Sequence, residues 1–197
     1  MVQVAYWLWV AFVAVWNVAA LWTGRVGSKA PAGQMLAYLV AYVLGFGLLF
    51  TQSTHGAVMG FAPWLPARSM VPLWDSGKVA AILVATELVA FGFALWARSH
   101  LGRLWSGMMT LRDSHRVVDT GPYRLVRHPI YTGFIGASLA LALLVATPAA
   151  LAGALVLIIV MTAKAHAEEA LLRRELGRGD YDAYAAHTPM LVPFASR

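Results

Sequence analysis

Histidine and tyrosine side chains gather in one polar stretch of the chain, residues 115–133, whose sequence is HRVVDTGPYRLVRHPIYTG. Imidazole rings and phenols can donate and accept hydrogen bonds, and a phenol ring also attracts a cation to its face. Tyrosine, arginine and a helix-starting proline are also typical of a membrane surface. An anchor would leave His115 and His128 unexplained, because histidine is not a preferred anchor residue. Both interpretations, anchor and binding site, stay open on these residues alone.

A second chemically rich stretch, KAHAEEALLRRELG, occupies residues 164–177. Helical spacing puts Lys164 and Glu168 on one face, and it places Glu169 four residues before Arg173, a favourable distance for an ion pair. We predict that Glu169 and Arg173 belong to a solvated surface. Glu168 lies about one turn beyond an apolar block, so we expect its carboxylate to face the stretch that carries His128.

Long apolar blocks must position these two stretches. Hydrophobic residues make up 60% of the chain and charged residues only 12%. Residues 4–22, 35–50 and 79–97 each approach the length of a bilayer span, and residues 130–163 are long enough for two. Thr147 and Pro148 divide that last block, because proline cannot continue a helical hydrogen-bond ladder. The sequence therefore predicts an all-α polytopic membrane protein with five transmembrane helices, the first of them retained rather than cleaved as a signal peptide.

The basic residues predict the orientation of these helices. Thirteen of the fifteen Lys and Arg residues fall after the first span, between the third and fourth, and after the fifth. Cytoplasmic loops carry such an excess, so we expect the N-terminus outside and the C-terminus inside. The pI near 10 then reflects topology and anionic lipid, and nucleic acid is not an expected partner.

The chain divides by chemistry into two parts. Residues 1–98 predict a three-span scaffold with little polar chemistry. Residues 99–197 hold a polar segment too long for a connector, the two-span hairpin, and a polar helix over 164–187 that ends near Gly177 and Gly179. We expect a binding pocket between these parts of the second half, on the cytoplasmic side.

Some chemistry is excluded and one acidic residue is left open. The chain has no cysteine, so thiolate metal sites are excluded and no metal is expected. No strand–GxGxxG–helix unit is present, which argues against a soluble dinucleotide fold. Glu87 lies in the middle of the third span, where it is either a buried hydrogen-bonded acid or the coupling residue of a small transporter.

Four sequence segments together carry a family resemblance. RHPIY, followed some forty residues later by EEALL, resembles the RHPxY…EExxL pattern of the isoprenylcysteine carboxyl methyltransferase family. HRVVDTGPY upstream and GDYDAYAAHTPMLVPF near the C-terminus are similar to two further family segments. The resemblance covers about residues 98–194 and is to integral membrane methyltransferases, with this chain a prokaryotic member. The same half also resembles bacterial phospholipid and small-thiol methyltransferases and, more distantly, sterol reductases.

The resemblance implies S-adenosyl-L-methionine as cofactor and a set of site residues. His128 and Tyr131 are expected to be catalytic, and Glu168 to bind the cofactor's ammonium group. Lys164 stands where the family has an arginine that meets the substrate. The implied cofactor-binding positions are His115, Arg116, Val117, Val118, Tyr123, His128, Pro129, Ile130, Tyr131 and Glu168.

The implied partners are membrane lipids and a lipophilic methyl acceptor at the cytoplasmic face of a prokaryotic cytoplasmic membrane. The acceptor can be an isoprenylcysteine-like carboxylate, a small isoprenoid, a phospholipid amine or a thiol. Two other classes of function remain: an NADPH-dependent membrane reductase of the sterol-reductase type, and a small transporter that uses Glu87.

Overall fold

A computed structural model describes residues 1–20, 32–50, 77–102, 118–175 and 178–195. In chain order its helices are α1 (Val2–Ala20), α2 (Ala32–Leu49), α3 (Gly77–Leu101), the short 3-10 helix η2 (Gly121–Arg124), α4 (Pro129–Val145), α5 (Pro148–Glu175) and α6 (Arg178–His187). No strand occurs in these ranges. The all-α prediction is confirmed for this part of the chain.

Four of the helices within the described ranges, α1, α2, α3 and α5, are long and apolar enough to cross a membrane, and α4 is a shorter apolar helix of 17 residues. The predicted hairpin is present: α4 ends at Val145, and Ala146 takes a left-handed conformation with φ of 53°. The Thr147 hydroxyl then accepts a hydrogen bond from the Ala150 N–H at 3.1 Å, which caps the start of α5.

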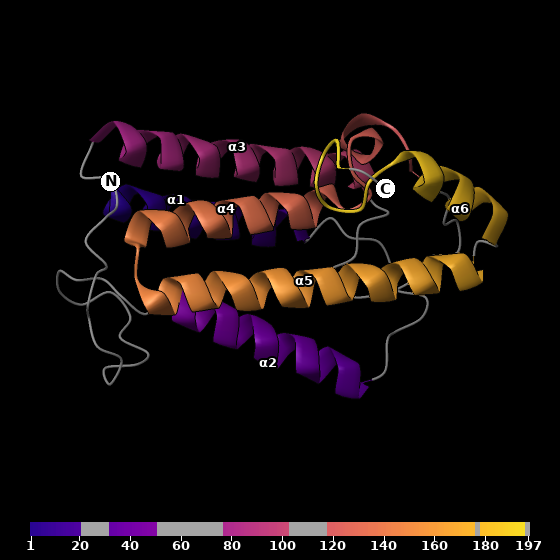
Figure 1. Cartoon of the computed structure of the whole chain (residues 1–197), viewed down its shortest axis with the longest axis horizontal. Helices are drawn as coiled ribbons and strands as arrows, with labels where there is room; N and C mark the ends of the chain where they lie inside the picture. The colour runs from indigo at the N-terminus through magenta and orange to yellow at the C-terminus, as the bar shows by residue number, and fades with distance from the viewer. Residues whose placement is uncertain (21–31, 51–76, 103–117, 176–177, 196–197) are drawn as a thin grey trace.

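The long helices lie roughly side by side, and α1, α3 and α5 run toward the end of the bundle where the C-terminus lies, while α2 and α4 run back (Figure 1). The closest packing is between α3 and α4 and between α2 and α5. Glycine makes both contacts possible. A Cβ atom on Gly133 would lie 2.6 Å from the Ala90 carbonyl oxygen, and one on Gly153 would lie 2.5 Å from the Leu49 nitrogen and 2.6 Å from the Gly45 oxygen.

We expect Gly153→Leu to separate α2 from α5, because the atoms that a side chain would meet are backbone atoms that cannot rotate away. Overpacking of this kind costs about 1–3 kcal/mol or more, and heat denaturation in detergent should show a clear fall in melting temperature. Gly92→Ala is the control, since no atom of the described residues, apart from its chain neighbours and its own helix backbone, lies within 4 Å of a Cβ at Gly92. It should be neutral or stabilising by up to about 1 kcal/mol. Equal melting temperatures for the two variants would contradict the close contact.

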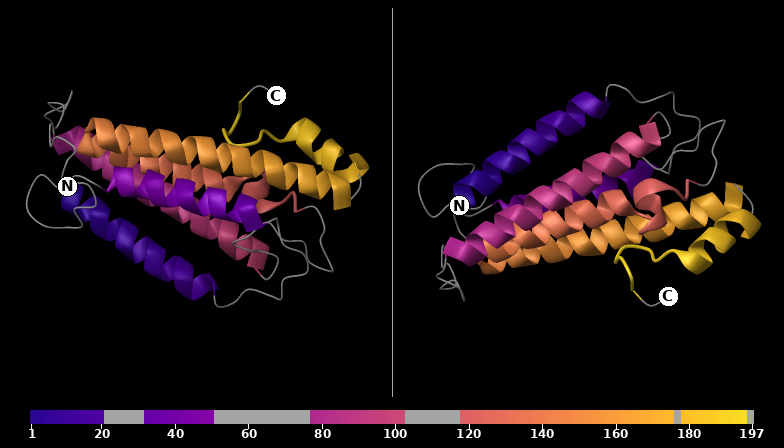
Figure 2. Two further views of the ribbon diagram at one scale, coloured as in Figure 1. Left: turned by 90° about the horizontal axis from the view of Figure 1, so that it is seen from below. Right: turned by 90° about the horizontal axis from the view of Figure 1, so that it is seen from above.

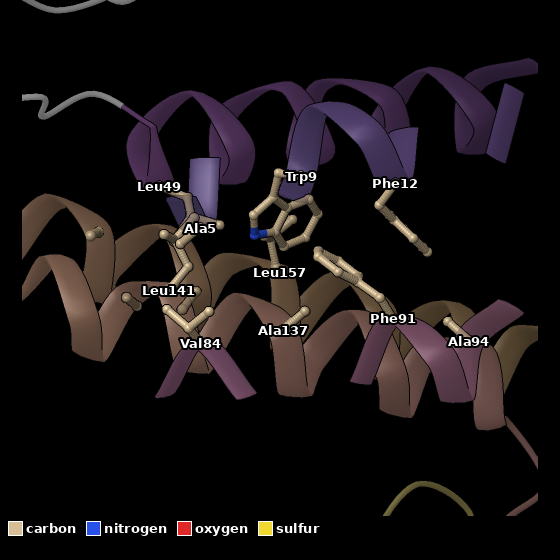
Figure 3. Close-up of a cluster of buried hydrophobic side chains, with 13 residues drawn as sticks. Ala5, Trp9, Phe12, Leu49, Val84, Phe91, Ala94, Ala137, Leu141 and Leu157 are labelled. Carbon is tan, nitrogen blue, oxygen red and sulfur yellow. The ribbon is translucent and has the colours of Figure 1, made fainter. Parts of the chain in front are cut away.

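Aromatic rings join α1 to the other helices in the core (Figure 3). Trp9 meets Phe91 edge-on with ring centroids 4.9 Å apart, and Phe12 stacks on Phe91 at 4.2 Å. Glu87 lies in this core at 1% exposure, so its predicted burial is confirmed. The Trp9 indole is the polar group beside it, but among the described residues no hydrogen bond of ordinary geometry reaches either carboxylate oxygen.

The polar end of the molecule is built by α5, α6 and the segment after α6. Helix α5 extends past the other long helices at this end (Figure 1), and α6 with the following residues folds back along it (Figure 2). The prediction of a single polar helix over residues 164–187 is therefore wrong in part, because α5 ends at Glu175 and α6 begins at Arg178. This fold-back brings residues 188–195, the tail segment, to the beginning of α4.

Candidate functional site

The chain approaches α4 through a tight turn that favours glycine. Gly121 has a φ of 58°, and a Cβ there would lie 2.8 Å from the His100 ring. The His100 Nε2 and the Thr120 hydroxyl are hydrogen-bonded at 2.9 Å. The turn is thereby fixed against the end of α3, and η2 follows it directly.

Tyr123, a predicted cofactor residue, uses both its hydroxyl and its backbone inside the protein. Its phenol donates a hydrogen bond to the Ala97 carbonyl at 3.4 Å, and its own carbonyl accepts one from the Tyr184 hydroxyl at 2.6 Å. Burial raises the pKa of both phenols well above the ordinary value, so both remain proton donors at neutral pH. The hydroxyl of Tyr123 is directed to the end of α3, which ties η2 to the bundle.

Four side chains from α4, its N-cap and α5 form one cluster, the Glu168 cluster: His128, Tyr131, Lys164 and Glu168. Tyr131 donates a hydrogen bond to Glu168 Oε1 at 2.6 Å, and Lys164 Nζ lies 3.8 Å from the same oxygen. The His128 and Tyr131 rings are nearly parallel, at 2° and 5.5 Å between centroids. Lys164 Nζ also lies 5.4 Å from the centroid of the Tyr131 ring.

Helix geometry explains why these residues meet. His128 is the N-cap of α4, with Pro129 at the first helical position, so Tyr131 stands in the first turn. Lys164 and Glu168 lie one turn apart on α5, as predicted, and α5 runs antiparallel to α4. His128 and Lys164 are buried, whereas Glu168 keeps 24% of its side chain exposed. The predicted approach of Glu168 to the segment carrying His128 is confirmed.

Glu169 is not the surface residue that the sequence predicted, and that prediction is wrong. Its side chain is 3% exposed, and Oε1 accepts hydrogen bonds from Arg127 Nε at 2.7 Å and from His128 Nε2 at 3.3 Å. The expected Arg173 pair is present, at 3.4 Å from Oε2. Adjacent helix positions point about 100° apart. Even so, both carboxylates have partners near the start of α4, because Glu168 contacts Tyr131 and Glu169 contacts Arg127 and His128.

Arg127 joins the beginning of α4 to the tail segment. Its backbone N–H donates to the Pro189 carbonyl at 2.9 Å, and the His128 N–H donates to the Met190 carbonyl at 3.0 Å. The Arg127 guanidinium donates to the carbonyls of Ala185 and Thr188 near the end of α6. The backbone of His128 is therefore held by the C-terminal part of the chain.

The other predicted site residues fall in three places. His115, Arg116 and Val117 lie outside the described residues. Val118 and Ile130 are half-buried and Pro129 is buried, close along the chain to His128. No group of three or more His, Asp or Glu side chains that could hold a metal ion occurs in the described ranges.

Sequence reasoning missed the contribution of α2. The Tyr42 phenol lies within electrostatic range of the Glu168 carboxylate, and the Tyr131 phenol within range of Tyr42. Gln34, Tyr38 and Tyr42 recur at four-residue spacing, and Gln34 donates a hydrogen bond to the Tyr38 hydroxyl at 3.3 Å. That polar stripe on an apolar helix was the available signal. The predicted scaffold half thus reaches the Glu168 cluster.

Four span-length apolar helices and a charged cluster at one end define a multi-pass helical membrane protein. Comparison with known proteins gives a family match. Residues 81–174 match the sequence model of the isoprenylcysteine carboxyl methyltransferase (ICMT) family. The matched range contains the Glu168 cluster, and the predicted family resemblance is confirmed.

Two curated relatives are similar over part of their length. The chain is 30% identical over 122 residues to the nickel-cobalt-cadmium resistance protein NccN of Alcaligenes xylosoxydans xylosoxydans, covering 61% of this chain and 54% of the relative. It is 32% identical over 98 residues to protein-S-isoprenylcysteine O-methyltransferase B of Arabidopsis thaliana, covering 48% of this chain and 49% of that protein. The chain spans about half the length of the curated relatives it matches.

Proposed function

We propose that the protein transfers a methyl group from S-adenosyl-L-methionine to a lipophilic acceptor at the cytoplasmic face of a membrane. The observation that carries this proposal is the Glu168 cluster, which lies within the residues that match the methyltransferase family. The family match supports the reaction class, and the cluster supplies the side chains that the cofactor would need.

The chemistry of the cluster fits this cofactor. Glu168 offers a partly exposed carboxylate, suited to the cofactor's α-ammonium group. Tyr131 offers a hydroxyl and a ring face that can attract a positively charged sulfonium. His128, Tyr123, Pro129, Ile130 and the segment His115–Val118 would complete the binding surface. The bound cofactor supplies an activated methyl group, so the protein's own work is to position the two reactants rather than to provide a nucleophile.

Lys164 is the proposed acceptor-side residue. Its ammonium group is close to Glu168 and lies over the Tyr131 ring. A lysine presents a point charge and lacks the paired donors of arginine. It suits a carboxylate acceptor less specifically than arginine would, and a small isoprenoid, a phospholipid amine or a thiol stays in the proposed acceptor class.

Calorimetry on the detergent-purified protein tests the proposed function. S-adenosylhomocysteine should bind with a measurable heat, and NADPH should not. Tritiated S-adenosylmethionine offered with an S-farnesyl cysteine derivative, phosphatidylethanolamine vesicles or an alkyl thiol should then label one acceptor class. Binding of NADPH without S-adenosylhomocysteine would replace the proposal with a reductase, and binding of neither would remove both.

The proposed membrane arrangement has five spans in the cytoplasmic membrane of a prokaryote. Helix α4 has 17 residues, about 25 Å at 1.5 Å per residue, which is the lower end of the spanning range. The start of α1 and the start of α4 lie at opposite ends of the bundle (Figure 1), and the Glu168 cluster includes the N-cap and first turn of α4. With the basic segments inside, the N-terminus is outside and the C-terminus inside. Residues 1–98 serve mainly as scaffold and residues 99–197 as the cofactor-binding core. Tyr42 of the scaffold lies close enough to Glu168 to interact with it electrostatically.

Reporter fusions check this arrangement. A reporter that is active only in the cytoplasm should be active after residue 110 and inactive after residue 60, because these positions lie on opposite sides in a five-span protein with the N-terminus outside. A periplasmic reporter at the same two positions is the control and should give the reverse result. Cytoplasmic activity after residue 60 instead of residue 110 would overturn both the orientation and the cytoplasmic site.

A further inference from the structure

Glu169 is a fully partnered charged side chain near the site, and it is shut off from solvent. Oε1 accepts from Arg127 and His128, while Oε2 pairs with Arg173. Arg173 in turn bonds Asp182 of α6 at 2.8 Å. With these partners around it and 3% exposure, Glu169 is poorly placed to meet a ligand directly.

The bond from His128 to Glu169 decides which ring nitrogen carries a proton. The Glu169 carboxylate has a guanidinium group at each oxygen, and an ionised carboxylate can only accept a hydrogen bond. The contact at 3.3 Å is therefore a hydrogen bond when Nε2 is protonated. The opposite edge of the ring, at Nδ1, lies 3.7 Å from Glu168 Oε2 and so faces the Glu168 cluster.

We infer that Glu169 is a positioning residue, which fixes the ring orientation and the Nε2 proton of His128 so that the Nδ1 edge faces the Glu168 cluster. The arrangement resembles the way a buried carboxylate holds an imidazole in one tautomer in hydrolytic triads. Glu169 acts on the ring while the tail segment holds the backbone of the same residue through Met190. His128 is thus fixed at both ends, and the two adjacent glutamates have separate tasks.

The same carboxylate also joins three parts of the chain. Through Arg127 it reaches the carbonyls at the end of α6, and through Arg173 it reaches Asp182 at the middle of α6. Glu169 therefore also contributes to the docking of α6 on α5, through contacts separate from its bond to His128. The inference rests on the proposed function for its ligand measurement only.

Nitrogen-15 NMR of histidine-labelled protein in detergent tests the inference without any ligand. His128 is assigned by the resonance lost in His128→Asn. In the wild-type protein its shifts should report a protonated Nε2, and in Glu169→Gln the proton should move to Nδ1 or divide between the two nitrogens. Unchanged His128 shifts in a folded Glu169→Gln protein would overturn the inference.

Calorimetry with S-adenosylhomocysteine supplies the second measurement. Removing the orienting partner of a ligand-binding histidine lowers affinity by about 10–100-fold in metal sites, and we expect Glu169→Gln to weaken binding by about 10-fold or more. Asp182→Asn is the control, because it removes the exposed partner of Arg173 and leaves Glu169 in place. Its affinity should stay within about threefold of wild type. Equal losses in the two variants would contradict a specific action on His128.

If the Glu169→Gln protein does not fold, a double variant allows the same NMR measurement. Arg127→Gln/Glu169→Gln removes both charges, so that no buried guanidinium is left alone. It should show the same change in the His128 shifts, and wild-type shifts would overturn the inference. If wild-type protein fails to bind S-adenosylhomocysteine, the proposed function fails, while the His128 shifts still decide whether Glu169 positions the ring.

Discussion

Glu168→Gln should weaken the binding of S-adenosylhomocysteine by about 30-fold or more. The carboxylate is the cluster's partly exposed acid and the proposed partner of the ligand ammonium. Loss of one member of a buried charge pair costs about 2–5 kcal/mol, and 2 kcal/mol already corresponds to about 30-fold in affinity. Titration calorimetry measures the effect directly.

Two variants separate charge from packing in this prediction. Tyr131→Phe removes the hydrogen bond to Glu168 and keeps the ring, so we expect a smaller loss than for Glu168→Gln. Asp182→Asn neutralises an exposed carboxylate whose ion pair is worth at most about 1 kcal/mol. If Glu168→Gln and Asp182→Asn bind equally well, the ammonium is bound elsewhere.

His128→Ala should reduce methyl transfer by about 100-fold or more while the protein stays helical and soluble in detergent. Misplacement of reacting groups by 1 Å can cost about 100-fold in rate, and this variant removes the ring that stacks beside Tyr131. Fold retention is expected because Glu169 keeps Arg127 and Arg173 as partners. Transfer of a tritiated methyl group measures the rate, and far-UV circular dichroism measures the helix content.

The matched control for His128→Ala is His166→Ala. His166 is an exposed histidine two residues after Lys164 on α5, and it is absent from the cluster contacts described above. It should retain nearly all transfer activity. If His128→Ala loses folded protein while His166→Ala stays folded, the main role of His128 is structural. That result would contradict its proposed catalytic role.

Sequence alone predicted the helices well because long apolar blocks leave few alternatives. The start of α5 at Pro148 followed from the absence of a backbone N–H in proline, and the meeting of Glu168 with the beginning of α4 followed from helical spacing. The expected helix end near Gly177 agrees with the end of α5 at Glu175, but one polar helix continuing to residue 187 does not, because α6 begins at Arg178.

The roles of the adjacent glutamates could not be read from spacing. The i,i+4 pair of Glu169 with Arg173 was correct, but it said nothing about burial. Burial depends on Arg127, forty-two residues earlier, whose backbone is bonded to the tail segment. The contribution of Tyr42 was equally hidden, because it requires the register of α2 against α5, which the glycine contacts at Gly45 and Gly153 determine.

The pairing of residues 127–132 with the tail segment has a consequence for the order of folding. Arg127, His128 and Thr132 each bond a carbonyl about sixty residues later, at Pro189, Met190 and Leu191. Synthesis delivers α4 and α5 to the bilayer well before those carbonyls exist, so the helices can insert while the start of α4 still lacks its partners. A chain stopped before residue 188 should therefore yield an inserted bundle with an unfinished ligand site, and competence to bind should appear as a late step, separate from membrane insertion.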